Sequence, residues 1–337
     1  MSARATNLLL LMLVFAALLT GGGVFLVGAP SWRGVVWLHD LAGFCLLGAF
    51  VWKRRIIVRS LRRHGAAPAV APGIALLALV LATLATGFGW SSTGLPSVRG
   101  YSALTIHAGL GLLVAMPLAV HAGAHWPRFG QRPGRRTLLR LAALGAGGFL
   151  LWQGSEATAR VLGLGGAARR YTGSRPVPAH EDFPATQWLF DDPAPLDRSR
   201  WRLQVGGHAH RVLELSWEEI DGRAVPVQAT IDCTGGWYAD RLWQGVPLAE
   251  LLARAEPRDG THSIVVRSVT GYWRRFGLGQ AKRLWLATRI DGEPLAHGHG
   301  APARLVVPDG RGYDWVKWVT EIEVSTAPAW LRWPLPV

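Results

Sequence analysis

The chain opens with long apolar runs and changes to alternating apolar and polar positions in its second half. Four runs reach or approach the roughly 20 residues that span a bilayer. They cover residues 7–28, 34–52, 73–90 and 102–125. A fifth run, 141–152, is shorter and rich in glycine. The pattern predicts an all-α transmembrane bundle of about five helices over residues 1–155.

After residue 175 the period of the apolar positions shortens to two, which is typical of β-strands. The predicted strands lie near residues 201–207, 227–232, 263–268, 304–308 and 319–324. One further segment, 247–255, begins with proline and predicts a short helix. The second half is therefore expected to be a mixed α+β, β-rich domain over 176–337, joined to the helices by a linker over 156–175.

The charge of the chain is concentrated in the apolar half. The whole chain carries a net charge of +14, but residues 1–153 contain 14 Lys and Arg against one acid, Asp40. Residues 154–337 contain 22 Lys and Arg against 21 acids. Because the basic excess lies between apolar runs, it indicates a lipid bilayer as the partner and argues against a nucleic acid.

The basic residues also predict an orientation. They gather in the loops after the second and fourth runs, and such loops stay in the cytoplasm. We therefore expect a multi-pass protein with a cytoplasmic N-terminus and with residues 176–337 on the outer side. Arg135 and Arg136 precede the weak fifth run. They are either a twin-arginine export signal of a bacterial inner membrane or only part of a topology-setting basic loop.

Histidines inside the apolar runs are candidate haem ligands. His39 and His107 lie five to six residues inside the second and fourth runs, which cross in the same direction and so place both imidazoles at one depth. Two histidines at one level in a helical bundle suit axial ligation of haem b, as in a cytochrome b. His121 lies deeper, where its partner position on the second run is Lys53. One haem is therefore expected, with His121 as a further possible ligand.

The second half contains four separated strings that resemble one family. They are Cys233-Thr-Gly-Gly-Trp, Trp243-Gln-Gly-Val-Pro-Leu, His299-Gly-Ala-Pro-Ala-Arg304 and Gly312-Tyr-Asp-Trp-Val-Lys317-Trp. In order and spacing they resemble the molybdopterin domain of the sulfite oxidase family, over about residues 176–330. The pattern is most similar to the periplasmic methionine sulfoxide reductase catalytic subunits within that family.

The resemblance implies a set of site residues. Cys233 falls where the family has the thiolate ligand of molybdenum, and a soft thiolate suits such a centre. The implied pterin-binding positions are Ser268, His299, Arg304, Trp315, Val316 and Lys317. Tyr272 either faces the metal or only packs. The implied cofactors are Mo-molybdopterin in this domain and haem b in the helices.

One departure from the family pattern directs the functional expectation. Sulfite oxidases place an arginine shortly after the cysteine, where this chain has Trp237 and Tyr238. Reduction of an S- or N-oxide is therefore the first hypothesis, with electrons exchanged through haem b with a membrane quinone or another carrier. Oxidation of sulfite or a related small anion is the alternative, with Arg241, Arg274 and Arg275 as its anion site. A non-catalytic electron-transfer or sensory membrane protein is the third.

Overall fold

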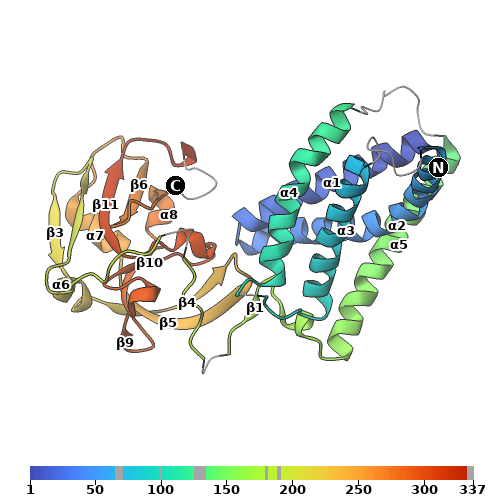
Figure 1. The fold of residues 1–337 in the computed structure, drawn as a ribbon. Helices are drawn as coiled ribbons and strands as arrows, with labels where there is room; N and C mark the ends of the chain where they lie inside the picture. Colours follow the sequence, from blue (N-terminus) through green and yellow to red (C-terminus); the bar gives the residue numbers. More distant parts are fainter. Residues whose placement is uncertain (65–70, 99, 125–133, 179–180, 188–190, 332–337) are drawn as a thin grey trace. The chain divides into compact units, whose positions relative to one another are not determined.

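The computed structural model describes the chain except residues 65–70, 99, 125–133, 179–180, 188–190 and 332–337. It divides into two compact units, Met1–Arg175 and Pro176–Val337. The first unit is helical and the second is built mainly of strands (Figure 1).

The helical unit contains five long helices. They are α1 (Ala3–Leu26), α2 (Arg33–His64), α3 (Ala71–Ser92), α4 (Ala103–Ala124) and α5 (Arg135–Val161). The segments 3–26, 30–63, 71–92 and 103–123 are long and apolar enough to cross a membrane. The four predicted spans are confirmed in number and position. Helix α1 packs on α2, α3 packs on α4, and α5 packs on α2.

Helix α5 is much longer than the apolar run of residues 141–152 that predicted it. It extends in both directions because its ends consist largely of good helix formers, Arg, Leu and Ala. Near its C-terminus the Nε of Arg160 donates to the carbonyl of Glu156 at 3.2 Å. The length of the apolar run therefore underestimates the length of this helix.

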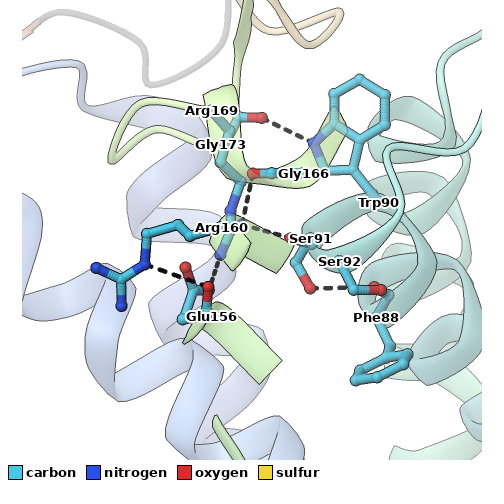
Figure 2. Close-up of polar contacts among 9 residues, drawn as sticks. All are labelled: Phe88, Trp90, Ser91, Ser92, Glu156, Arg160, Gly166, Arg169 and Gly173. Carbon is cyan, nitrogen blue, oxygen red and sulfur yellow. Dashed lines mark hydrogen bonds and ion pairs between the residues drawn. The ribbon is translucent and has the colours of Figure 1, made fainter. Parts of the chain in front are cut away.

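The predicted linker, residues 156–175, contains the end of α5 and a 3₁₀ turn, η2 (Gly165–Ala168). Figure 2 shows how this segment is fixed to the end of α3. The Arg169 guanidinium pairs with the Glu156 carboxylate and also donates to the Ser91 carbonyl. The indole N–H of Trp90 donates to the Gly173 carbonyl at 2.7 Å. These contacts make the segment part of the helical unit's packing.

The β unit contains two sheets. The six-stranded sheet has the order β1-β5-β8-β10, with β4 paired to β5 and β9 paired to β8. Its strands are β1 (Arg175–Pro176), β4 (Val225–Cys233), β5 (Trp237–Pro247), β8 (Trp285–Ile290), β9 (Glu293–Pro294) and β10 (Arg304–Val306). All pairings in this sheet for which the register is given are antiparallel.

The five-stranded sheet has the order β3-β2-β11-β6-β7. Its strands are β2 (Arg202–Gly207), β3 (Leu213–Ser216), β6 (Ser263–Ser268), β7 (Trp273–Gly277) and β11 (Val319–Ser325). Three short helices complete the unit: α6 (Trp217–Asp221), α7 (Leu248–Ala255) and α8 (Leu278–Ala281). One buried cluster, which includes Trp243, Leu203 and Leu251, is shared by strands of both sheets. The mixed, β-rich fold class is confirmed.

Candidate functional site

A tight hairpin places Cys233 at the end of β4. In the register of β4 and β5, Cys233 lies opposite Trp237, and the intervening turn closes with the Gly236 N–H donating to the Cys233 carbonyl at 3.1 Å. Gly236 has φ +93°, a conformation that side chains rarely tolerate. The Gly-Gly of the sequence thus builds the turn that holds the cysteine at the sheet's edge.

The thiol of Cys233 is buried and surrounded by polar groups. The Gly235 N–H donates to its Sγ at 3.3 Å. Burial is the main influence and raises the pKa of the thiol, while the Gly235 N–H, the Thr186 hydroxyl and the Arg311 guanidinium act in the opposite direction. Burial thus favours the protonated thiol, the three polar neighbours oppose this effect in part, and a bound metal cation would favour the thiolate.

A cavity opens beside this thiol. Its described walls come from four parts of the sequence: residues 183–187 with Asp191, residues 231–237, residues 299–304 and residues 312–318, with Tyr272 as an isolated member. Aromatic side chains dominate the walls, and the rings of Phe183 and His299 have centroids only 4.3 Å apart. Three of the four recognised strings thus meet around one space.

Arg304 lies buried in the cavity wall, and no carboxylate partner occurs among the residues that the structure describes. Its guanidinium donates to the carbonyls of His299 at 3.0 Å and Trp315 at 3.4 Å, while its Nε has no partner among those residues. Burial lowers the pKa of Arg304 to about 9. A buried guanidinium with an unused donor is expected to bind an anion.

Lys317 and His299 extend the same basic site. The Lys317 ammonium donates to the carbonyls of Thr186 at 2.9 Å and Gly298 at 2.5 Å. Burial, followed by repulsion from Arg304, lowers the pKa of Lys317 to about 7. The same two causes, in the same order, lower the pKa of His299 to about 4, and its Nδ1 has no partner in the described chain.

The other predicted pterin residues divide into two groups. Trp315 lines the cavity, and its buried indole N–H has no partner among the described residues. Val316 is buried behind the wall, where its carbonyl accepts from the Leu305 N–H at 2.8 Å. Ser268 ends β6, bonds Thr270 at 3.1 Å and is not part of the described cavity wall.

Tyr272 lines the cavity, but its hydroxyl donates to the Tyr313 carbonyl. Burial raises the pKa of Tyr272, so this phenol stays protonated. With its single proton engaged by a carbonyl, Tyr272 is held in place and contributes one ring face to the cavity.

The three arginines of the alternative anion site lie elsewhere. Arg274 forms a buried ion pair with Asp314, Nε to Oδ1 at 2.9 Å. Arg275 donates to the hydroxyl of Ser263 at 2.7 Å, and Arg241 donates to the Glu181 carbonyl. None of the three arginines belongs to the described cavity wall.

Sequence reasoning missed three residues of the site. Arg311 and Asp232 form a buried ion pair at 2.6 Å directly beside Cys233. Thr186 contacts the Lys317 ammonium through its carbonyl and the Cys233 thiol through its hydroxyl. A charged residue next to the cysteine was the available signal for Asp232, whereas nothing local marked Arg311.

In the helical unit, His39 of α2 and His107 of α4 come together as the equal depth predicted. Their ring centroids are 5.9 Å apart and the rings are nearly perpendicular. The Nδ1 of His39 bonds the Ala17 carbonyl at 3.0 Å, and the Nδ1 of His107 bonds the Thr83 carbonyl at 2.8 Å. A carbonyl only accepts, so each Nδ1 carries the hydrogen and each Nε2 keeps a lone pair.

His121 and Lys53 do not repeat this arrangement. The Lys53 ammonium donates to the Asn7 side chain at 2.9 Å. His121 lies near Gly73, at whose position an added Cβ would be 3.8 Å from the His121 ring. No second pair of histidine rings in contact occurs in the described helices.

The fold and the cavity define a β-rich domain that presents a buried thiol beside buried cations. Comparison with known proteins identifies this class. Residues 191–333 match the family model of the oxidoreductase molybdopterin binding domain. The β unit is therefore a molybdopterin-binding oxidoreductase domain of the sulfite oxidase family, and the chain is an enzyme.

The chain matches only part of the length of each of these relatives. The chain is 29% identical over 141 residues to YuiH, an uncharacterized oxidoreductase of Bacillus subtilis, covering 40% of this chain and 70% of that protein. It is 30% identical over 146 residues to the protein-methionine-sulfoxide reductase catalytic subunit MsrP of Xanthomonas axonopodis, covering 38% of this chain and 45% of that protein.

More distant similarities extend to other redox enzymes. NADH nitrate reductase 1 of Oryza sativa is 26% identical over 167 residues, covering 39% of this chain and 18% of that protein. Among solved structures, the sulfane dehydrogenase SoxCD of Paracoccus pantotrophus has a TM-score of 0.38 at 26% identity, covering 40% of each chain.

Proposed function

We propose that this protein is a membrane-bound, molybdenum-dependent oxidoreductase that reduces an S- or N-oxide with electrons received through haem b. The observation that carries the proposal is a buried thiol in a cavity whose wall also holds two cations. Its oxidoreductase class comes from the matched domain, whereas the substrate, the haem and the electron route are our inference.

The residues around the cavity fit a molybdenum–pterin cofactor. Cys233 would bind the metal, and Arg304 and Lys317 would bind the phosphate of the pterin. Two buried donors without described partners, the Arg304 Nε–H and the Trp315 indole N–H, together with the unpartnered Nδ1 of His299, favour a polar ligand rich in acceptors. Bound there, the cofactor would supply two-electron oxygen-atom chemistry.

The two histidines of the helical unit fit haem b. With both Nδ1 hydrogens held by carbonyls, neither Nε2 can donate to the other, so two lone pairs remain for one Lewis acid. Hydrogen bonds to the outer nitrogen are the usual way in which proteins orient such ligands. The haem would supply one-electron transfer between the pterin centre and a quinone or another membrane carrier.

The cavity favours a neutral oxide over an oxyanion. Arg241, Arg274 and Arg275 are each bonded to other groups and lie outside the described wall. Trp237, which lies opposite Cys233 in the hairpin, and Tyr272 also line the cavity, and their rings would accept an apolar sulfide or amine. Oxidation of sulfite or a related small anion is the alternative.

The location follows from the helices and their charge. Four helices could cross a bilayer, and the basic loops favour a cytoplasmic N-terminus with the catalytic domain on the outer side of a bacterial inner membrane. A protein with a folded cofactor domain outside would need an export route for folded chains, for which Arg135 and Arg136 are the candidate signal.

Three measurements on the purified full-length chain test the proposal. Metal and haem analysis should give about one molybdenum and one haem b per chain. Turnover with a reduced viologen should occur with dimethyl sulfoxide or trimethylamine N-oxide, and sulfite should not reduce the haem. Absence of molybdenum from protein made in a cofactor-competent host would refute the enzyme reading, and reduction of the haem by sulfite would favour the alternative.

A further inference from the structure

A six-residue segment occurs twice in the helical unit in similar form, and each copy contacts one of the two histidines. Residues 16–21 read Ala-Ala-Leu-Leu-Thr-Gly on α1, and residues 82–87 read Ala-Thr-Leu-Ala-Thr-Gly on α3. The two segments agree at Ala, Leu, Thr and Gly. Each lies on the first helix of a packed pair, and each receives a histidine from the second helix of that pair.

The hydrogen bonds repeat with the sequence. His39 bonds the carbonyl of residue 17, and His107 bonds that of residue 83, which is the second position of each segment. The Thr20 hydroxyl donates to the Ala16 carbonyl at 2.6 Å, and the Thr86 hydroxyl donates to the Ala82 carbonyl at 3.0 Å. Each threonine hydroxyl is therefore bonded to the same helical turn whose backbone carbonyl accepts the hydrogen of the imidazole.

The glycine of each segment leaves the space that the ring occupies. A Cβ added at Gly21 would be 2.8 Å from Cε1 of His39, and one added at Gly87 would be 2.7 Å from Cε1 of His107. Both distances are shorter than real contacts allow. Glycine in a helix interior costs about 1 kcal/mol relative to alanine, so two glycines at equivalent positions indicate a steric requirement.

We propose that the helical unit contains two copies of one histidine-seating hairpin, in which Thr20–Gly21 and Thr86–Gly87 are positioning residues for His39 and His107. This inference rests on the proposed function of the two histidines as haem ligands. It explains why α1 and α3, which carry no ligand themselves, are required: each supplies the acceptor that leaves the ligand's Nε2 lone pair free.

The copies differ in one contact. The Thr20 oxygen is 3.2 Å from Nδ1 of His39, and because its hydrogen is donated to Ala16 it acts as a second acceptor there. The Thr86 hydroxyl donates to the Thr83 carbonyl at 2.9 Å, as the Thr20 hydroxyl does to the equivalent Ala17 carbonyl at 3.3 Å, but it has no described contact with His107. Removing the Thr20 hydroxyl should therefore change the electron density of one ligand, whereas removing that of Thr86 should act only on a carbonyl.

The chain offers matched controls for the test. An added Cβ at Gly22 on α1, or at Gly109 on α4, has no heavy atom within 4 Å. Full-length Gly21→Ala and Gly87→Ala should lose haem, with a haem-to-protein ratio about 10-fold lower, the scale of lost outer contacts of metal ligands. Gly22→Ala and Gly109→Ala should match the wild type.

The potential of the haem supplies a second readout. Thr20→Val should raise the midpoint potential, because the imidazole loses an acceptor that favours ferric iron, and Thr20→Ser should restore it. The proposal is overturned if Gly21→Ala and Gly22→Ala have the same haem content, spectrum and potential. If Gly21→Ala does not accumulate, equal potentials of the wild type, Thr20→Val and Thr20→Ser overturn it instead.

The haem assignment itself can fail separately. If His39→Ala and His107→Ala both retain a normal low-spin haem, the proposed ligands are wrong, whatever the glycine variants do. Loss of haem in both histidine variants, together with normal haem in Gly21→Ala and Gly87→Ala, would leave the ligands in place and refute only the seating hairpins.

Discussion

In the helical unit, side chains that could bind a cofactor are held by backbone carbonyls of neighbouring helices, whereas in the β unit the carbonyls hold the charged side chains that surround a thiol. His39 and His107 each donate the Nδ1 hydrogen to one carbonyl, which leaves the Nε2 lone pair of the neutral imidazole available to a metal. Arg304 and Lys317 each donate to two carbonyls and can bind an anion in their charged forms. In the proposed function these carbonyls would orient the ligands of a haem iron in one unit and the cations for a pterin phosphate in the other.

The largest expected effect on one unit alone comes from substitution of Cys233. Cys233→Ser replaces the candidate soft ligand by a hard one, so turnover should fall by more than about 100-fold, beyond the range seen when only an outer contact of a ligand is lost. The haem content and spectrum should be unchanged, because the ligands of the other unit are untouched. Steady-state turnover and the absorbance spectrum check both halves, and haem loss in this variant would contradict the independence of the two sites.

The reciprocal test removes the histidines. His39→Ala or His107→Ala should abolish the low-spin b-type haem, and His121→Ala should retain it, because only the first two share a gap with free lone pairs. Molybdenum content should stay near one per chain in all three. Chemical haem assay and metal analysis are the measurements. Two haems per wild-type chain would overturn the single-haem assignment.

Export of the β unit is the next comparison. Arg135→Lys combined with Arg136→Lys keeps the charge of the basic loop but removes a twin-arginine signal. If the pair is a signal, the four preceding helices should still insert while most of the β unit stays on the cytoplasmic side. Protease added to spheroplasts should then digest the wild-type domain and spare the variant's. Equal digestion would show that the pair only sets topology.

The two units also differ in how far the sequence foretells them. The four spans follow from apolar length alone, and the meeting of His39 with His107 follows from equal depth on co-directional helices. Strand β2, whose buried and exposed positions alternate, and strand β6, which contains the apolar run Ile-Val-Val, were predicted as well. Strand β5 was missed because its inward positions include Arg241, a buried charge that interrupts the apolar period.

The cavity of the β unit could not be predicted from local sequence patterns. Its walls join residues near 186, 233, 304 and 317, and only a family resemblance linked three of these segments. Arg311 and Thr186 escaped because their roles arise from contacts with distant residues, Asp232 and Lys317. The Thr-Gly repeat is readable in the sequence, yet its meaning depends on the ring that each glycine meets.

Substitution of Arg304 should have opposite effects on cofactor loading and on the thermal stability of the cofactor-free protein. Arg304→Met removes a buried cation without a described carboxylate, so the cofactor-free protein should unfold at the same temperature or a few degrees higher. Cofactor loading should fall by about 10-fold, because a charge-assisted contact to an anion is lost. Thermal unfolding of protein from a cofactor-deficient host and molybdenum content from a competent host provide the two measurements. A large destabilisation would contradict an anion-binding role.

The smallest expected effect is a pH dependence that arises from Lys317. Its pKa is lowered by burial to about 7 from an ordinary value of 10.5. Between these values the unfolded chain holds a proton that the folded chain has lost, so the stability of the cofactor-free protein rises with pH. Because the pKa of Arg304 is about 9, the window that reports Lys317 is pH 7 to 9.

An anionic ligand reverses this slope, because it needs the ammonium charged. Cofactor binding should therefore weaken as the pH rises from 7 to 9, while the unfolding temperature of the cofactor-free wild type increases by a few degrees. Lys317→Met should flatten both slopes while binding is weak, and Lys317→Arg should flatten both while binding stays strong, because a guanidinium keeps its charge in the folded and the unfolded chain across this window. If Lys317→Met keeps the wild-type slope, another group titrates in this window, and the ammonium is not the cation that the anion meets.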